Sequence, residues 1–287
     1  MKVKREAGEF PGRVEIELSG TCNLNCTYCP RKYMGGLNGF MPLELYERLI
    51  DEMSAYPDTV VVLHRRGESL LHPRFIEMCD YIKGKFKEVQ IATNATLLDD
   101  AKSRAIIDAI DFISFSIDVP EIFDKTRIPA RYADVESRIL RFLDMNKGRV
   151  LTQVSMVKTT ETPSVNPERF KKIWTGKVNR IRIYEEHSRD GKFGSLIKKR
   201  ESRMPCVMPF YELLVYFDGS VGRCNHDWNG EPMGNLNGMS IGELWSSARY
   251  EALRAQHRDL NITDEVCRGC DSWYAEVRVQ GTGETVE

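Results

Sequence analysis

The stretch VEIELSGTCNLNCTYCP, residues 14–30, joins a strand-like run to three closely spaced cysteines. The run VEIEL at its start alternates branched apolar and acidic side chains, which predicts a β-strand. Cys22, Cys26 and Cys29 then follow at the spacing CX3CX2C. A closed tetrahedral metal site needs a fourth ligand, but the next His or Cys after Cys29 is His64. The stretch therefore predicts a site with three thiolates and one open position in the loop after the first strand.

Composition places the chain among globular proteins with little net charge. The 287 residues include 41 basic and 42 acidic side chains, and 41% are hydrophobic. The chain therefore lacks the excess of basic residues that is typical of nucleic-acid-binding proteins, and no nucleic-acid partner is expected. No apolar run is long enough to span a membrane, and the segment MKVKREAGEF at the start lacks the apolar part of a secretory signal. We therefore expect a cytoplasmic protein with no membrane partner.

Strand-like runs alternate with amphipathic helical stretches through the first two-thirds of the chain. After the first strand, further strands are predicted over residues 59–64, 89–93, 112–117, 151–157 and 180–185. The helices predicted between them cover residues 42–53, 73–85, 99–110, 134–145 and 167–174. This alternation is typical of a parallel sheet with helical crossovers, and six units favour an incomplete βα barrel. The predicted fold is α/β, with a partial (β/α)6 barrel over residues 1–188.

The pattern changes in residues 189–287, where we expect a small cysteine-rich second domain. Residues 212–224 predict a hairpin that turns at Asp218-Gly219, and residues 240–256 predict one short helix. The last four cysteines of the chain lie in this part: Cys206, Cys224, Cys267 and Cys270. Four thiolates can close either a structural zinc site or a four-iron cluster, and the residues alone leave both open.

Clustered cysteines in a reducing compartment are more consistent with metal ligands or catalysts than with disulfides. A four-iron cluster held by three thiolates has one iron without a protein ligand, whereas the bland alternative is three buried structural thiols. The eighth cysteine, Cys79, lies in an apolar helical stripe and is expected to pack in the core.

The CX3CX2C motif after the first strand of a partial βα barrel resembles the signature of the radical S-adenosylmethionine enzymes. The resemblance implies a [4Fe-4S] cluster on Cys22, Cys26 and Cys29, with S-adenosyl-L-methionine bound to the open iron. It further implies that electron transfer into the sulfonium releases a 5′-deoxyadenosyl radical, which abstracts hydrogen from a substrate. An external electron donor such as flavodoxin or ferredoxin would then be a partner.

Further positions resemble elements that bind the cosubstrate in this family, and they lie in or just after predicted strands. The segment RRGES resembles the family's GGEP element at Gly67 and Glu68, which implies that Glu68 holds the methionyl amino group. Asn94 and Ser116 match positions that contact the ribose and carboxylate, although Asn94 could instead cap the following helix and Ser116 could fill a tight sheet position. Tyr28 resembles an aromatic that packs near adenine.

The second domain resembles the SPASM and twitch extensions of these enzymes. Its spacing CX12GX4C followed by CX2C matches their auxiliary [4Fe-4S] sites, and the absence of further cysteines favours the shorter twitch form. The resemblance implies that Cys206, Cys224, Cys267 and Cys270 hold one fully ligated auxiliary cluster, with zinc as the alternative. His226 is a candidate to hydrogen-bond this cluster, and His257 is expected at the surface or in a cap.

Candidate substrate or catalytic groups lie at or just after the carboxyl ends of the second, fifth and sixth predicted strands: Arg65, Arg66, Lys158, Tyr184, Glu185, Glu186 and His187. The resemblance to a twitch-bearing aminocyclitol dehydrogenase implies an oxidoreductase acting on a small polar metabolite, with the auxiliary cluster accepting an electron. An epimerase is an alternative, but it needs a hydrogen donor and no spare thiol is evident. A peptide-modifying maturase usually carries a domain before the barrel, and about thirteen residues precede the first strand here. A non-catalytic, zinc-stabilised binding module is the alternative of another class.

Overall fold

Six parallel strands form the first part of the fold. The computed structural model describes residues 7–35, 37–162, 165–186, 203–228, 230–270 and 273. The strands are β1 (Arg13–Ile16), β2 (Val60–Val62), β3 (Val89–Thr93), β4 (Phe112–Ser116), β5 (Leu151–Lys158) and β6 (Arg180–Glu185). They pair in parallel in the order β6-β5-β4-β3-β2-β1, as a partial barrel requires. The predicted α/β fold with six parallel strands is confirmed.

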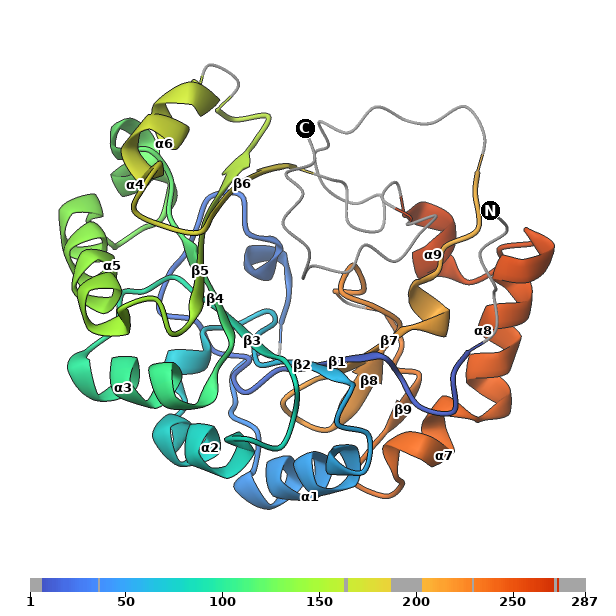
Figure 1. Cartoon of the computed structure of the whole chain (residues 1–287). Helices are drawn as coiled ribbons and strands as arrows, with labels where there is room; N and C mark the ends of the chain where they lie inside the picture. Colours follow the sequence, from blue (N-terminus) through green and yellow to red (C-terminus); the bar gives the residue numbers. More distant parts are fainter. Residues whose placement is uncertain are drawn as a thin grey trace.

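Helices cover the outer side of this sheet (Figure 1). They are α1 (Leu43–Ser54), α2 (Phe75–Ile82), α3 (Asp100–Ala109), α4 (Pro120–Thr126), α5 (Tyr132–Asn146) and α6 (Pro167–Trp174). The pattern did not predict α4, a short helix that begins at Pro120. In β4 the buried Phe115 packs against Phe142 of α5, with ring centroids 5.3 Å apart. Ser114 and Ser116 therefore face the opposite side of the strand, toward the barrel interior.

The C-terminal strands continue the same sheet. Strand β7 (Glu212–Val215) pairs in parallel with β1, and β8 (Ser220–Gly222) pairs antiparallel with β7. Strand β9 (Gly234–Asn235) completes the edge. The predicted hairpin is confirmed, and Gly219 has the positive φ of +83° that its turn requires. The predicted domain boundary falls between residues 187 and 202, outside the described residues, and stays a prediction.

Three C-terminal helices lie beside these strands (Figure 1): α7 (Ile241–Trp245), α8 (Ala248–Asp259) and α9 (Glu265–Gly269). The prediction of one helix over residues 240–256 is wrong, because Ser247 caps a new helix by accepting a hydrogen bond from the Tyr250 backbone N–H. Short 3-10 turns occur at Pro30–Tyr33 (η1), Ser69–Leu71 (η2) and Met208–Phe210 (η3).

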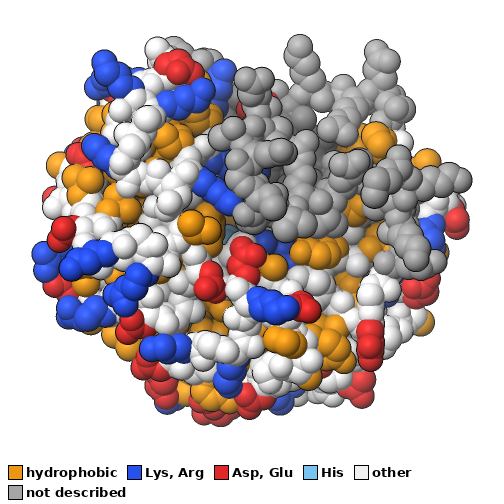
Figure 2. Space-filling model, viewed as in Figure 1, with side chains coloured by type: hydrophobic (Ala, Val, Ile, Leu, Met, Phe, Trp, Pro, Cys, Tyr) orange, Lys and Arg blue, Asp and Glu red, His pale blue; other side chains and the backbone are white. Residues whose placement is uncertain are grey.

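The surface carries charges of both signs. Figure 2 shows Lys and Arg side chains interspersed with Asp and Glu over the described part of the visible face, in keeping with the near-neutral net charge. Within the described ranges, every helix is too short or too polar to cross a membrane.

Candidate active site

The three N-terminal cysteines lie together in the loop that follows β1, and each is partly buried. Burial raises the pKa of the Cys22 thiol, and burial raises the pKa of Cys26 to about 12. The thiols of Cys22 and Cys26 are therefore protonated at neutral pH without metal, so iron binding must displace protons from them. Their soft sulfur donors fit an iron-sulfur cluster.

The loop after β2 packs directly on the cysteine loop at Gly67. A Cβ atom at Gly67 would lie 2.1 Å from the Ser19 carbonyl oxygen and 2.5 Å from that of Thr21. The next residue, Glu68, donates its backbone N–H to the Thr21 carbonyl at 2.8 Å. A side chain at position 67 would push the two loops apart, which explains the glycine.

The Glu68 carboxylate joins the ends of β2 and β3. It is 3% exposed and accepts hydrogen bonds from the Thr93 hydroxyl at 2.8 Å, the Asn94 backbone N–H at 2.8 Å and the Leu70 backbone N–H at 3.1 Å. Burial raises the pKa of Glu68, and these hydrogen bonds act in the opposite direction. The carboxylate is thus fixed beside the cysteine loop, while its predicted role toward the cosubstrate stays a prediction.

Asn94 lies against the first cysteine. Its Nδ2 donates to Oδ1 of Asn23 at 3.1 Å and is 3.9 Å from Sγ of Cys22, and its Oδ1 accepts from the Thr96 backbone N–H at 3.0 Å. The alternative that Asn94 caps the following helix is wrong, because Asp99 caps α3. Asn94 therefore orders the cysteine loop from the β3 side.

Tyr28 and Ser116 occupy the side of the site formed by β4. The Tyr28 hydroxyl donates to Asp118 at 3.2 Å, and its ring centroid is 5.6 Å from the Arg127 guanidinium carbon. Ser116 ends β4 opposite Ser155 and is partly exposed. Their predicted contacts with the cosubstrate stay predictions.

Arg66 pairs with a buried acid. Its Nε and Nη2 donate to the two carboxylate oxygens of Glu17 at 2.9 and 2.8 Å, and the Glu17 side chain is fully buried. The guanidinium carbon lies 3.7 Å from the centroid of the Tyr216 ring, which follows β7. The Arg66 side chain therefore connects the loop after β2 to the C-terminal part of the chain.

Arg65 makes a second connection of this kind. Its Nη2 donates to the Asp227 carbonyl at 3.1 Å, and its guanidinium carbon lies 4.9 Å from the ring of Trp228. The Tyr216 hydroxyl donates to the same Asp227 carbonyl at 2.6 Å. Arg65 thus lies between the loop that carries Glu68 and the loop that carries Cys224.

The remaining candidates lie at the carboxyl ends of β5 and β6. Lys158 is opposite Glu185 in the strand register. Tyr184 is 38% exposed, and its ring centroid is 4.6 Å from the Arg182 guanidinium carbon. His187 lies outside the described residues. The described residues Lys158, Tyr184 and Glu185 lie near the open edge of the sheet, and none of these three hydrogen-bonds to Cys22, Cys26 or Cys29.

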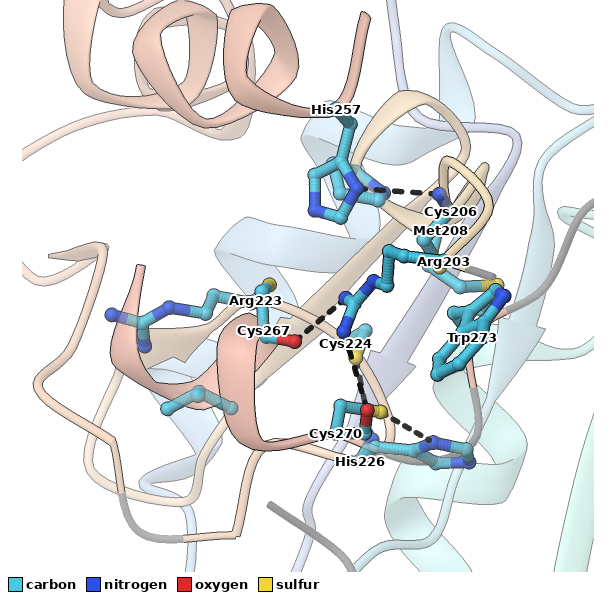
Figure 3. Close-up of a pocket in the computed structure, with 12 residues that line it drawn as sticks. Arg203, Cys206, Met208, Arg223, Cys224, His226, His257, Cys267, Cys270 and Trp273 are labelled. Carbon is cyan, nitrogen blue, oxygen red and sulfur yellow. Dashed lines mark hydrogen bonds between the residues drawn. The ribbon is translucent and has the colours of Figure 1, made fainter. Parts of the chain in front are cut away.

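The four C-terminal cysteines line one pocket (Figure 3). Cys206 precedes η3, Cys224 follows β8, Cys267 lies in α9 and Cys270 follows that helix. Across the described ranges, no three His, Cys, Asp or Glu side chains converge closely enough to hold a single metal ion. Four soft thiols around a shared space are donors that suit either a four-iron cluster or a zinc ion.

An ion-pair network assembles this pocket. Arg223 donates from Nε to Asp264 at 2.7 Å and from Nη1 to Asp227 at 2.8 Å. Asp264 caps α9 by accepting the Cys267 backbone N–H at 3.0 Å. Arg223 therefore holds the loop of its neighbour Cys224 against the start of the helix that carries Cys267.

Two pocket residues were missed or misjudged from the sequence. Arg203 donates to the carbonyls of Cys267 at 2.6 Å and Cys270 at 3.3 Å, although nothing but its place near Cys206 indicated a role. His257 was expected at the surface or in a cap; the expectation of a surface position is wrong, because the side chain is fully buried and its Nδ1 accepts the Cys206 backbone N–H at 3.2 Å.

Nδ1 of His226 lies 3.9 Å from the Cys270 sulfur (Figure 3), and its predicted hydrogen bond to the auxiliary cluster stays a prediction. Burial, with Glu212 as the next contribution, raises the pKa of Cys224 well above its usual value. Burial also raises the pKa of Cys267. Thiolates at these positions need a metal-borne positive charge nearby.

Models of two known protein families match the parts of the chain that hold the two cysteine groups. The family model of the radical SAM superfamily matches residues 16–164, and that of an iron-sulfur cluster-binding domain, SPASM, matches residues 206–271. The chain is 29% identical to the tungsten-containing aldehyde ferredoxin oxidoreductase cofactor-modifying protein of Pyrococcus furiosus, over 83% of this chain and 82% of that protein. It is 20% identical to the S-adenosyl-L-methionine-dependent 2-deoxy-scyllo-inosamine dehydrogenase of Niallia circulans, over 93% and 95% of the two chains.

Among solved structures, the fold is similar to that of SuiB from Streptococcus suis bound to the precursor peptide SuiA. The TM-score is 0.69 at 12% identity, and the match covers 88% of this chain and 68% of that one. The superfamily match spans just over half of the 287 residues and includes the CX3CX2C loop and the Gly67-Glu68 loop packed on it. The chain therefore belongs to the radical SAM superfamily: it is a radical SAM enzyme with a C-terminal SPASM domain, and its cofactors are [4Fe-4S] clusters and S-adenosyl-L-methionine.

Proposed function

We propose that this enzyme is an oxidoreductase that removes two hydrogens from a small polar metabolite, such as a sugar or aminocyclitol. Cys22, Cys26 and Cys29 are the proposed ligands of the cluster that binds S-adenosyl-L-methionine. The auxiliary cluster is assigned to the four cysteines of the C-terminal pocket. When bound, the first cluster and its cosubstrate supply the one-electron chemistry that takes a hydrogen atom from the substrate.

The observation that carries the choice of dehydrogenation is the place of the eighth cysteine. Seven cysteines belong to the two groups, and Cys79 is fully buried in α2, within the core between helices and sheet. Burial raises the pKa of its thiol to about 12. An epimerase must return a hydrogen to the substrate, and Cys79 does not face the barrel interior. A dehydrogenase needs no such donor.

The barrel interior supports a polar substrate. Gln153 Nε2 donates to the Ser114 hydroxyl at 2.9 Å, and Ser114 and Ser155 are linked at 3.3 Å. These side chains and Ser116 occupy alternate positions of β4 and β5 that face away from the helices. Hydroxyl and amide groups can exchange hydrogen bonds with a hydroxylated or amino-substituted ring.

The electron balance supports a role for the second cysteine group. Removal of two hydrogens takes one as a hydrogen atom in 5′-deoxyadenosine and the other as a proton, so one electron remains for an acceptor. The C-terminal pocket, joined to the loop after β2 by Arg65 and Arg66, is our candidate site for that acceptor. A protein of the flavodoxin or ferredoxin type is the proposed external donor for the first step.

Turnover in deuterium oxide tests the reaction type. We expect reduced enzyme, incubated anaerobically with a panel of cyclitols and amino sugars, to form 5′-deoxyadenosine and a product two hydrogens lighter than its substrate. Mass spectrometry measures both. Cys79→Ala should retain turnover, because its thiol lies in the core.

A product one mass unit heavier than the substrate in deuterium oxide, together with loss of product in Cys79→Ala, would identify an epimerase. SuiB was crystallised with a precursor peptide, so a set of peptides belongs in the same assay. Turnover of a peptide and of none of the small molecules would replace the proposed substrate class.

Glu68→Gln is expected to weaken binding of S-adenosyl-L-methionine by about tenfold or more while both clusters are retained. A charge-assisted hydrogen bond to the ligand's ammonium group contributes roughly 1.5–3 kcal/mol. Calorimetry on reconstituted enzyme measures the affinity. Thr93→Val is the matched control, since it removes a neighbour of the carboxylate and keeps the charge. Equal affinities for wild type and Glu68→Gln would refute the assignment.

A further inference from the structure

A buried ion pair packs against the CX3CX2C loop. Arg127 donates from Nε to Oδ2 of Asp118 at 2.8 Å and from Nη2 to Oδ1 at 3.2 Å. The Asp118 side chain is fully buried and that of Arg127 is 6% exposed. Asp118 follows β4 and Arg127 follows α4, so the pair closes the end of the barrel beside these two elements. Burying two charges costs solvation energy, and such pairs are weak evidence for stability alone.

The backbone places this pair at the middle cysteine. The N–H of Asn25 donates to the carbonyl of Ile128 at 2.7 Å, and the N–H of Thr27 donates to that of Thr126 at 2.9 Å. Asn25 and Thr27 flank Cys26, just as Thr126 and Ile128 flank Arg127. Two hydrogen bonds therefore align Cys26 with Arg127 as partners on adjacent chain segments.

Side chains extend the same contact. The Tyr28 hydroxyl and the Thr126 hydroxyl both donate to Oδ2 of Asp118, at 3.2 and 3.1 Å. Asp118 thus accepts hydrogen bonds from the guanidinium and from two hydroxyl groups, and the guanidinium carbon lies 5.6 Å from the centroid of the Tyr28 ring. The cation therefore lies against the cysteine loop, on the segment that pairs with Cys26.

We propose that Arg127 is a positioning residue that holds Cys26 and, as a buried cation, makes the cluster on Cys22, Cys26 and Cys29 easier to reduce. The inference rests on the ligand assignment under the proposed function. A reduced cluster carries one more negative charge, so a nearby buried cation stabilises the reduced state more than the oxidised one. Asp118 sets the position of that cation.

The test is a redox titration of the reconstituted full chain, followed by the electron paramagnetic resonance signal that changes on addition of S-adenosyl-L-methionine. Arg127→Met removes the charge and is expected to disfavour reduction at least tenfold, which is about 59 mV to lower potential for a one-electron couple. Asp118→Asn removes the opposing charge and is expected to shift the potential upward. Arg127→Lys should stay near wild type.

Arg223→Met is the matched control, because this buried arginine serves the auxiliary group and should leave the titrated signal in place. A purely structural role does not predict shifts of the reduction potential with opposite signs in the Arg127→Met and Asp118→Asn variants. An Arg127→Met enzyme with full iron content and the wild-type potential overturns the proposal.

If Arg127→Met loses the N-terminal cluster, the Arg127→Lys variant decides. Loss of the cluster in Arg127→Lys as well overturns the role of the charge, whereas a retained cluster with the wild-type potential supports that role. Failure of the ligand assignment has a separate signature, since the titrated signal would then survive alanine at all three cysteines.

Discussion

Replacing Cys22, Cys26 and Cys29 together by alanine is expected to halve the iron content, from about eight to about four atoms per chain, and to abolish 5′-deoxyadenosine formation. The three residues lie in one loop after β1, whereas the other four ligand candidates line a separate pocket. Loss of one group therefore leaves the donors of the other in place. Iron analysis after anaerobic reconstitution and product analysis by chromatography measure the two effects.

Cys79→Ala is the matched control for this experiment, because it removes a core thiol and should retain all the iron. Complete loss of iron from the triple variant would refute the division into two independent groups. Zinc in place of iron at the second group would refute the auxiliary cluster and leave the first assignment untouched.

Arg66→Ala is expected to lower the free energy of unfolding by about 3–5 kcal/mol, because it leaves a buried acid without its partner. Glu17 is fully buried, and three of its hydrogen bonds come from the backbone N–H, Nε and Nη2 of Arg66. The variant should also weaken binding of S-adenosyl-L-methionine, since Arg66 precedes Gly67 and Glu68. Denaturant unfolding under anaerobic conditions measures the stability.

Arg131→Ala provides the comparison, because Arg131 pairs with Asp124 at the surface and such pairs contribute about 1 kcal/mol or less. A Glu17→Gln change added to Arg66→Ala should recover part of the loss, since the acid is then neutral. If Arg66→Ala unfolds like Arg131→Ala, the internal pair does not stabilise the loop.

Local patterns predicted most of the fold because each strand and helix carries its own periodicity. Residues 89–93 and 180–185 form strands with the predicted bounds, and residues 167–174 form the predicted helix. The single helix predicted over residues 240–256 failed at Ser247, because a serine can cap a new helix inside an amphipathic run. Helix α4 was missed because seven residues show too little periodicity.

The cysteine groups could be predicted because their ligands are close in sequence or follow a known spacing. The contacts made by the charged and polar residues around these groups could not be predicted. Arg66 was a candidate to hold substrate, but its partner Glu17 is 49 positions away and belongs to a run that predicts an ordinary strand. His257 is 51 positions from Cys206, and a histidine in a polar helix predicts an exposed side chain. Such pairs exist only after the sheet brings distant segments together.

The direct pairing of β7 with β1 has a consequence for how such an enzyme can diverge. The loop with Cys22 follows β1, and the hairpin that leads to Cys224 begins at β7, so neighbouring strands set the spacing of the two cysteine groups. A change in the length of the segment that links the two parts along the chain therefore leaves the distance an electron must cross unaltered, as long as β1 and β7 stay paired. In this architecture the redox geometry depends on one strand pairing and not on the connection between the domains.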